Sequence, residues 1–110
     1  MTIEFNTQFA RVDDSLINVI REEILKISHR FKDISRAEVV LKEDSRINPV
    51  QNKICEIRLS VFGDDLLVHN RSDDFRKATK NVLKELKKLI NQLTIKQGKP
   101  ADIITSTVKV

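Results

Sequence analysis

Five lysines in the last third of the chain recur at spacings of three and four residues: Lys77, Lys80, Lys84, Lys87 and Lys88. In a helix this spacing places the five ammonium groups along one face, over about 16 Å at a rise of about 1.5 Å per residue. Only Glu85 is acidic within the segment. Like charges four residues apart destabilise a helix, so their repetition favours a face that binds phosphate groups over a merely solvated one.

The distribution of charge also favours a polyanionic partner. The chain has 110 residues and a formal net charge of +4. Residues 1–70 carry 10 Lys/Arg and 12 Asp/Glu, whereas residues 71–110 carry 10 Lys/Arg and only 4 Asp/Glu. A cationic segment on one side of a folded domain is typical of phosphate binding with counterion release. A lysine face that only improves solubility is the alternative.

The residues that could perform catalysis are few and scattered. His29 and His69 stand in no metal-ligand spacing with each other or with Cys55. The acidic pairs at 13–14, 64–65 and 73–74 lie at expected helix starts and turns, where aspartate accepts hydrogen bonds from free backbone donors. Two glycines are too few for a phosphate-binding loop. We therefore predict no enzyme, no metal, no cofactor and no small-molecule substrate.

Stacking of bases on the sheet is also disfavoured. The chain has no tyrosine or tryptophan, and its five phenylalanines mostly fit core positions. Phe62 is the only one predicted to point away from the core. Recognition of the backbone and shape of structured RNA suits this composition better.

The overall composition indicates one domain that acts in the cytoplasm. No apolar run approaches the roughly 18 residues of a membrane span, and the N-terminus shows no secretory signal. The single cysteine cannot form an internal disulfide. We expect one domain over residues 1–99 and a short tail over residues 100–110.

The elements that would position the lysines follow from the periodicity. Alternating residues predict strands at 2–7, 36–42, 55–61 and 66–70, with a polar loop over 43–52. A helical apolar stripe runs over 14–31, and a second one follows the acidic pair at 73–74 and ends before Gly98. The order β-α-β-β-β-α predicts an α+β fold in which an antiparallel sheet carries two helices on one face.

The two helices could form a single basic surface if they lie side by side. Lys26, Arg30 and Lys32 lie near the end of the first, and Lys96 and Lys99 follow the lysines of the second. The alternative is a protein-interaction module that uses the open sheet face or the apolar residues of the tail.

Four stretches, together with the element order, resemble a known family: residues 37–42 (AEVVLK), 55–59 (CEIRL), 73–78 (DDFRKA) and 86–93 (LKKLINQL). The chain resembles the bacterial ribosome hibernation promoting factors of the ribosome-associated inhibitor, or sigma-54 modulation protein, family. The resemblance covers about residues 1–99 and is distributed over the element order and the helix composition.

The resemblance implies a fold similar to double-stranded-RNA-binding domains. It also implies binding to the small ribosomal subunit, in the channel used by mRNA and tRNA, and inhibition of translation in stationary phase or stress. Long members carry a further C-terminal domain that pairs ribosomes, so the chain resembles a short form. Self-association is left open.

The implied contacts to ribosomal RNA fall on seven residues: Arg30, Lys32, Lys77, Lys84, Lys87, Lys88 and Lys96. The spacing of the lysines adds Lys80 to these candidates. Two residues depart from the family pattern. The family commonly has an apolar residue at the position of Thr79 and an acidic residue at the position of Lys80. Glu22 and Glu23 beside Lys26 reduce the basic character of the first helix.

Overall fold

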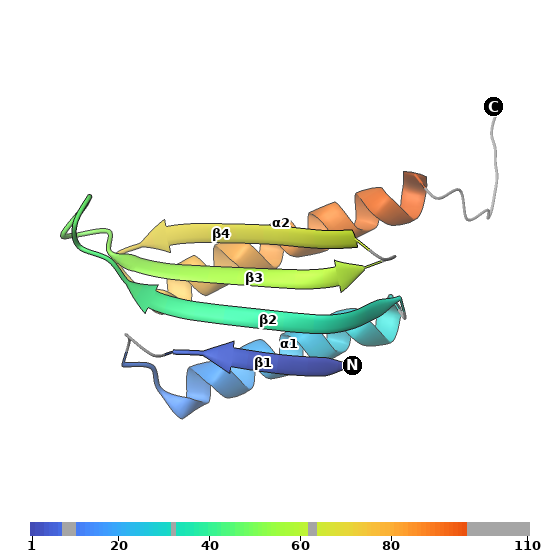
Figure 1. Cartoon of the computed structure of the whole chain (residues 1–110), viewed down its shortest axis with the longest axis horizontal. Coiled ribbons are helices and arrows are strands. Elements are labelled where there is room, and N and C mark those ends of the chain that lie inside the picture. The colour runs from blue at the N-terminus through green and yellow to red at the C-terminus, as the bar shows by residue number, and fades with distance from the viewer. Residues whose placement is uncertain (8–10, 32, 62–63, 97–110) are drawn as a thin grey trace.

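Two helices cover one face of a four-stranded sheet (Figure 1). The computed structural model describes residues 1–7, 11–31, 33–61 and 64–96, with residues 94–96 described by their backbone. The elements are β1 (Thr2–Asn6), α1 (Asp14–Arg30), β2 (Ile34–Glu43), β3 (Lys53–Val61), β4 (Asp64–Ser72) and α2 (Phe75–Lys96). The predicted α+β class and the order β-α-β-β-β-α are confirmed. The predicted tail, residues 100–110, lies outside the described residues.

The sheet is mixed, with its strands in the order β1-β2-β3-β4. β2, β3 and β4 pair antiparallel, as predicted. The prediction of a wholly antiparallel sheet is wrong for β1, which pairs with β2 in parallel and places Ile3 opposite Ala37. The reason is α1, because a crossover helix returns the chain to the end of the sheet at which β1 began, so β2 runs in the same direction as β1.

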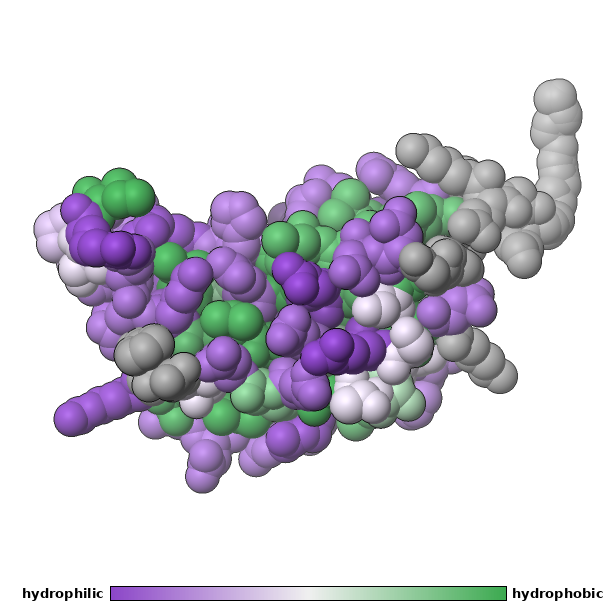
Figure 2. Space-filling view, in the orientation of Figure 1, coloured by the Kyte–Doolittle hydropathy of each residue, from purple (hydrophilic) through white to green (hydrophobic). Residues whose placement is uncertain are grey.

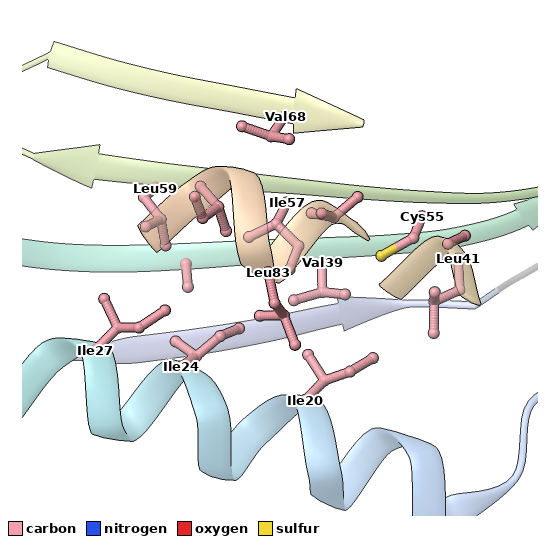
Figure 3. Packing of buried hydrophobic residues seen from close by; sticks show 14 of the residues in the cluster. Ile20, Ile24, Ile27, Val39, Leu41, Cys55, Ile57, Leu59, Val68 and Leu83 are labelled. Atoms are coloured by element: carbon pink, nitrogen blue, oxygen red, sulfur yellow. The ribbon is translucent and has the colours of Figure 1, made fainter. Parts of the chain in front are cut away.

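A single core lies between the helices and the inner face of the sheet (Figure 3). Alternate residues of β2 and β3 point into this core, and every third or fourth residue of each helix meets them. Fully buried members are Ile20, Ile24, Val39, Leu41, Ile57, Leu59, Leu86 and Ile90. Full burial of such a side chain contributes about 1.5–3 kcal/mol relative to exposure, so these contacts fix the rotation of each helix about its axis.

The acidic pairs at 13–14 and 73–74 lie at helix starts, as predicted, whereas the pair at 64–65, expected in a turn, begins β4 because both residues pair with the end of β3. Asp74 Oδ1 accepts a hydrogen bond from the backbone N–H of Arg76 at 2.8 Å, at the start of α2. Asp64 Oδ1 accepts one from the N–H of Asp65 at 2.9 Å, at the start of β4. Asp13 is the N-cap of α1, although its side chain makes no capping bond. The carboxylates of Asp74 and Asp64 therefore stabilise local backbone structure.

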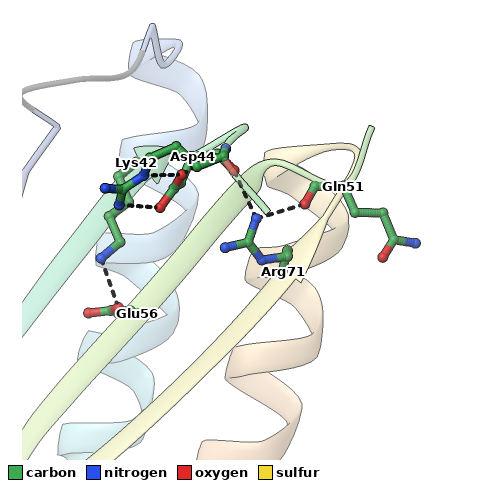
Figure 4. Close-up of polar contacts among 6 residues, drawn as sticks. Lys42, Asp44, Gln51, Glu56 and Arg71 are labelled. Atoms are coloured by element: carbon green, nitrogen blue, oxygen red, sulfur yellow. Dashed lines mark hydrogen bonds and ion pairs between the residues drawn. The ribbon is translucent and has the colours of Figure 1, made fainter. Parts of the chain in front are cut away.

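The loop between β2 and β3 is held by Arg71 (Figure 4). One guanidinium nitrogen of Arg71 donates to the carbonyl oxygens of Asp44 at 2.9 Å and Gln51 at 3.0 Å. Arg46 binds the Asp44 carboxylate at 2.8 Å and holds the pKa of that carboxyl far below its usual range. The predicted loop is therefore fixed at its base, while Ile47 at its tip is 82% exposed.

One buried hydroxyl interrupts the apolar face of α2. Thr79 is 3% exposed, and its Oγ1 has no ordinary hydrogen-bond partner among the described residues. Its polar neighbour is the thiol of Cys55, a weak partner. Burial raises the pKa of this thiol to about 11, and the contact with Thr79 offsets the rise only in part.

Substitution of Thr79 by valine should therefore raise the free energy of unfolding by about 1 kcal/mol, because it removes a desolvated hydroxyl and keeps the side-chain shape. Urea denaturation measures the change. Thr79→Ser is the control, since it keeps the hydroxyl, removes a methyl group and should destabilise the protein. A valine variant less stable than the wild type would show that the contact with Cys55 stabilises the fold.

Candidate nucleic-acid interface

The lysines of α2 form an exposed ridge along the side of the helix that faces away from the core. Val82, Leu86 and Ile90 bury one side of α2 against the sheet and α1. This burial fixes the opposite side toward solvent. The ridge, as predicted, contains Lys77, Lys80, Lys84, Lys87 and Lys88, all of which are exposed.

Three ridge lysines have no anionic partner within the described part of the chain. Lys77 binds Asp73 at 3.3 Å, one turn before it, and Lys87 binds Glu23 of α1 at 3.0 Å. No ion pair reaches Lys80, Lys84 or Lys88 from the described residues. Their positive charge is therefore available to an external anion.

The two helices lie side by side and run in the same direction (Figure 1). Near their N-termini, Arg76 donates a hydrogen bond to Ser15 Oγ at 3.1 Å. Farther along, Glu23 of α1 accepts hydrogen bonds from Lys87 at 3.0 Å and from Lys26 at 3.2 Å. The basic ends of the two helices are thus brought into one surface.

Glu23 is the acid that links the helices. Its hydrogen bonds with Lys87 and Lys26 lower the pKa of its carboxyl group, so it is ionised at neutral pH. Sequence analysis treated Glu23 only as a charge that weakens the basic character of α1. The structure shows that it fixes two ammonium groups beside each other at the junction of the helices.

The C-terminal end of α1 joins this surface through a cavity of about 420 Å³. Arg30 and Lys87 line it together, so the structure brings these two predicted residues to one place. Lys32, also predicted, lies outside the described residues, and Lys96 is the last residue of α2, described only by its backbone.

The cavity is also lined by residues that were not among the predicted RNA contacts. His29, Phe31 and Asn91 line it, and Phe31, which was expected in the core, is only half-buried. Phe31 lies just past the last turn of α1, and core packing weakens where a helix ends. Its position in the sequence was therefore a signal that its ring is not fully buried. Phe62, the predicted stacking candidate, lies outside the described residues.

The open face of the sheet differs from the ridge because its charges neutralise one another. Ion pairs join Arg36 to Glu4, Arg58 to Glu38 at 3.7 Å and Lys42 to Glu56 at 3.3 Å. Each cation comes from one strand and each anion from a neighbouring one. Figure 2 shows this face as hydrophilic with scattered apolar patches. The ion pairs leave it without a single sign of charge.

Other kinds of site find no support in the described part of the chain. Its His, Cys, Asp and Glu side chains form no group of three or more suited to a metal ion. Neither described helix combines the length and the apolar character that a membrane span requires.

A row of exposed lysines along one helix of an α+β domain is typical of the class of proteins that bind nucleic acid through its phosphates. The model of the family described as sigma 54 modulation protein / S30EA ribosomal protein matches residues 3–97. The chain belongs to this family, which confirms the resemblance found in the sequence. It is therefore a ribosome-associated hibernation protein, and members of this family are binding factors rather than enzymes.

Solved structures share the fold. A ribosomal subunit interface protein from Coxiella burnetii aligns with a TM-score of 0.70 and 18% identity, over 86% of this chain and 99% of that one. The N-terminal domain of protein Y from Thermus thermophilus aligns with a TM-score of 0.68 and 17% identity, over 84% of this chain and 99% of that one. A search of curated proteins found no match.

Proposed function

We propose that the chain inhibits translation by occupying the mRNA and tRNA channel of the small ribosomal subunit. The lysine ridge and Arg30 bind phosphates of ribosomal RNA, while the folded body fills space that mRNA and tRNA require. A ribosomal partner makes the cytoplasm the compartment in which the protein acts.

The observation that carries this proposal is the contrast between the two faces of the molecule. Lys80, Lys84 and Lys88 have no anionic partner among the described residues, whereas the cations of the sheet face are paired. An uncompensated row of ammonium groups attracts a polyanion, and paired charges do not. This contrast favours RNA binding over the alternative of a protein partner on the sheet face.

The salt dependence of binding tests the proposal. About five phosphate contacts predict a slope near −4 for the logarithm of affinity against the logarithm of salt concentration. The affinity for purified small subunits should then fall by roughly two orders of magnitude between about 50 and about 200 mM salt. Cosedimentation across a salt series measures the slope, and binding that persists unchanged at high salt would contradict the phosphate-contact mechanism.

Competition tests the position on the subunit. Prior loading of small subunits with mRNA and tRNA should prevent cosedimentation, because the proposed site is then filled. Simultaneous binding of all three would refute occlusion of the channel while leaving the ribosome as partner.

A further inference from the structure

The cavity between the C-terminal halves of α1 and α2 has a chemical character that phosphate binding alone does not explain. It is lined by Lys26, Ile27, Arg30, Phe31, Lys87 and Asn91, together with His29. Its volume of about 420 Å³ falls within the range of small-molecule pockets, about 300–1,000 Å³. A surface that contacts only phosphates needs no such recess.

The inner wall of the cavity is apolar and ends in a planar cation. Ile27 is buried in the core and Phe31 is half-buried beside it. The guanidinium carbon of Arg30 lies 5.7 Å from the centre of the Phe31 ring, in a cation–π contact. Nucleobases stack on aromatic rings and on arginine planes, so this pair offers a surface for a flat heterocycle.

The rim of the cavity holds two ammonium groups at the spacing of an anion. One oxygen of the Glu23 carboxylate accepts a hydrogen bond from Lys87 at 3.0 Å, and the other accepts one from Lys26 at 3.2 Å. A phosphate group could bind the same two donors with two of its oxygens. Glu23 thus preorganises Lys26 and Lys87 and also competes with an incoming phosphate.

Other cavities of the described chain lack this combination. The groove between β4 and α2 includes Lys84 and Lys88, but its ring is the imidazole of His69, no arginine lines it, and Glu85 reduces its positive charge. The recess beside β1 contains Phe5, but its charged residues are Glu4 and Glu38. Phosphate-binding cations and a stacking surface therefore meet between the helices.

We propose that this interhelical cavity binds one unstacked nucleotide of RNA, with its base on the Arg30–Phe31 pair and a phosphate between Lys26 and Lys87. The inference rests on the proposed function, because it places a nucleotide of the bound RNA at the end of the lysine ridge. Asn91, whose side chain can both donate and accept hydrogen bonds, lies where it can meet the edge of the base.

Nuclear magnetic resonance titration of the full chain tests whether a base is bound. Adenosine monophosphate and a single-stranded RNA tetranucleotide should shift the signals of the Phe31 ring and the Asn91 amide, whereas ribose 5-phosphate should shift neither. The tetranucleotide should bind at least about tenfold more tightly than the mononucleotide, because its other phosphates reach the ridge. Equal shifts with ribose 5-phosphate would overturn base binding, and equal affinities would overturn the assignment to RNA.

Phe31→Leu tests the stacking surface and retains apolar packing. It should lower the affinity for the tetranucleotide by roughly tenfold. Phe5→Leu is the matched control, because Phe5 also contacts an arginine, Arg21, at 5.1 Å but outside the cavity. Thermal unfolding of each variant shows that it is folded. Equal losses in the two variants, or none in Phe31→Leu, would overturn the proposal.

Glu23→Gln tests the phosphate position by a gain of binding, which misfolding cannot produce. The substitution removes the competing charge and leaves an amide oxygen that still accepts a hydrogen bond from a lysine, so it should raise the affinity for the tetranucleotide about threefold. An unchanged or lower affinity would overturn the placement of phosphate between Lys26 and Lys87. Binding of the wild-type protein to small subunits is measured separately. A failure to bind them would refute the proposed function even if the cavity binds the oligonucleotide.

Discussion

The combined substitution of Lys84, Lys87 and Lys88 by glutamate is expected to lower the affinity for small ribosomal subunits by at least about 100-fold. Three phosphate contacts are lost, and three carboxylates now repel the RNA. Each lost contact reduces the salt dependence of binding. The slope of the logarithm of affinity against the logarithm of salt concentration should therefore become shallower by about three. Cosedimentation across a salt series measures both quantities.

A control on the sheet face separates the ridge from net charge. One variant carries glutamine at Lys84, Lys87 and Lys88. A second variant carries glutamine at Arg36, Lys42 and Arg58, so the change in net charge is the same. We expect a large loss of binding for the first and little for the second, because the sheet cations already bind Glu4, Glu56 and Glu38. Equal losses would show that overall charge, rather than the ridge, governs binding.

Substitution of Leu86 by alanine should lower the free energy of unfolding by about 3 kcal/mol, within the usual range of about 2–5 kcal/mol. Leu86 is fully buried where α2 packs on the core, and alanine leaves a cavity that its neighbours fill only in part. The total stability of a domain is about 5–15 kcal/mol, so the loss is a large fraction of it. Urea denaturation measures the change.

The result for Leu86 also bears on the interface, because the buried stripe fixes which side of α2 faces solvent. Glu85→Ala, one residue away on the exposed side, should change the stability by no more than about 0.5 kcal/mol. A loss below about 1 kcal/mol for Leu86→Ala would mean that α2 is not held by close packing. The fixed orientation of the ridge would then lose its physical basis.

Sequence analysis predicted most of the elements because their patterns are local. The stripe at Leu16, Ile20, Ile24 and Ile27 is buried as expected, and α1 ends at Arg30, one residue before the predicted end. Thr79, at a position where the family pattern favours an apolar residue, lies on the buried side of α2. Periodicity reveals which face of an element is apolar, so these predictions required no knowledge of the partners.

The site was predicted in part. The lysine ridge followed from spacing within one helix, and the structure confirms its exposure. The cavity beside it was not predicted, because Phe31 and Arg30 meet Lys87 and Asn91 only when the helices pack side by side. Residues so far apart in the sequence leave no periodic signal of their contact.

The sequence alone determined the order of the elements, the cationic face of α2 and the resemblance to a ribosome-associated family. The tertiary structure decided the parallel pairing of β1, the neutralisation of the sheet face and the ion pair between Glu23 and Lys87 across 64 residues of chain. The physical reason is the range of the interactions. Amphipathic patterns arise within one turn or one strand, whereas the direction of a strand and the neighbours of a charge depend on how distant elements dock.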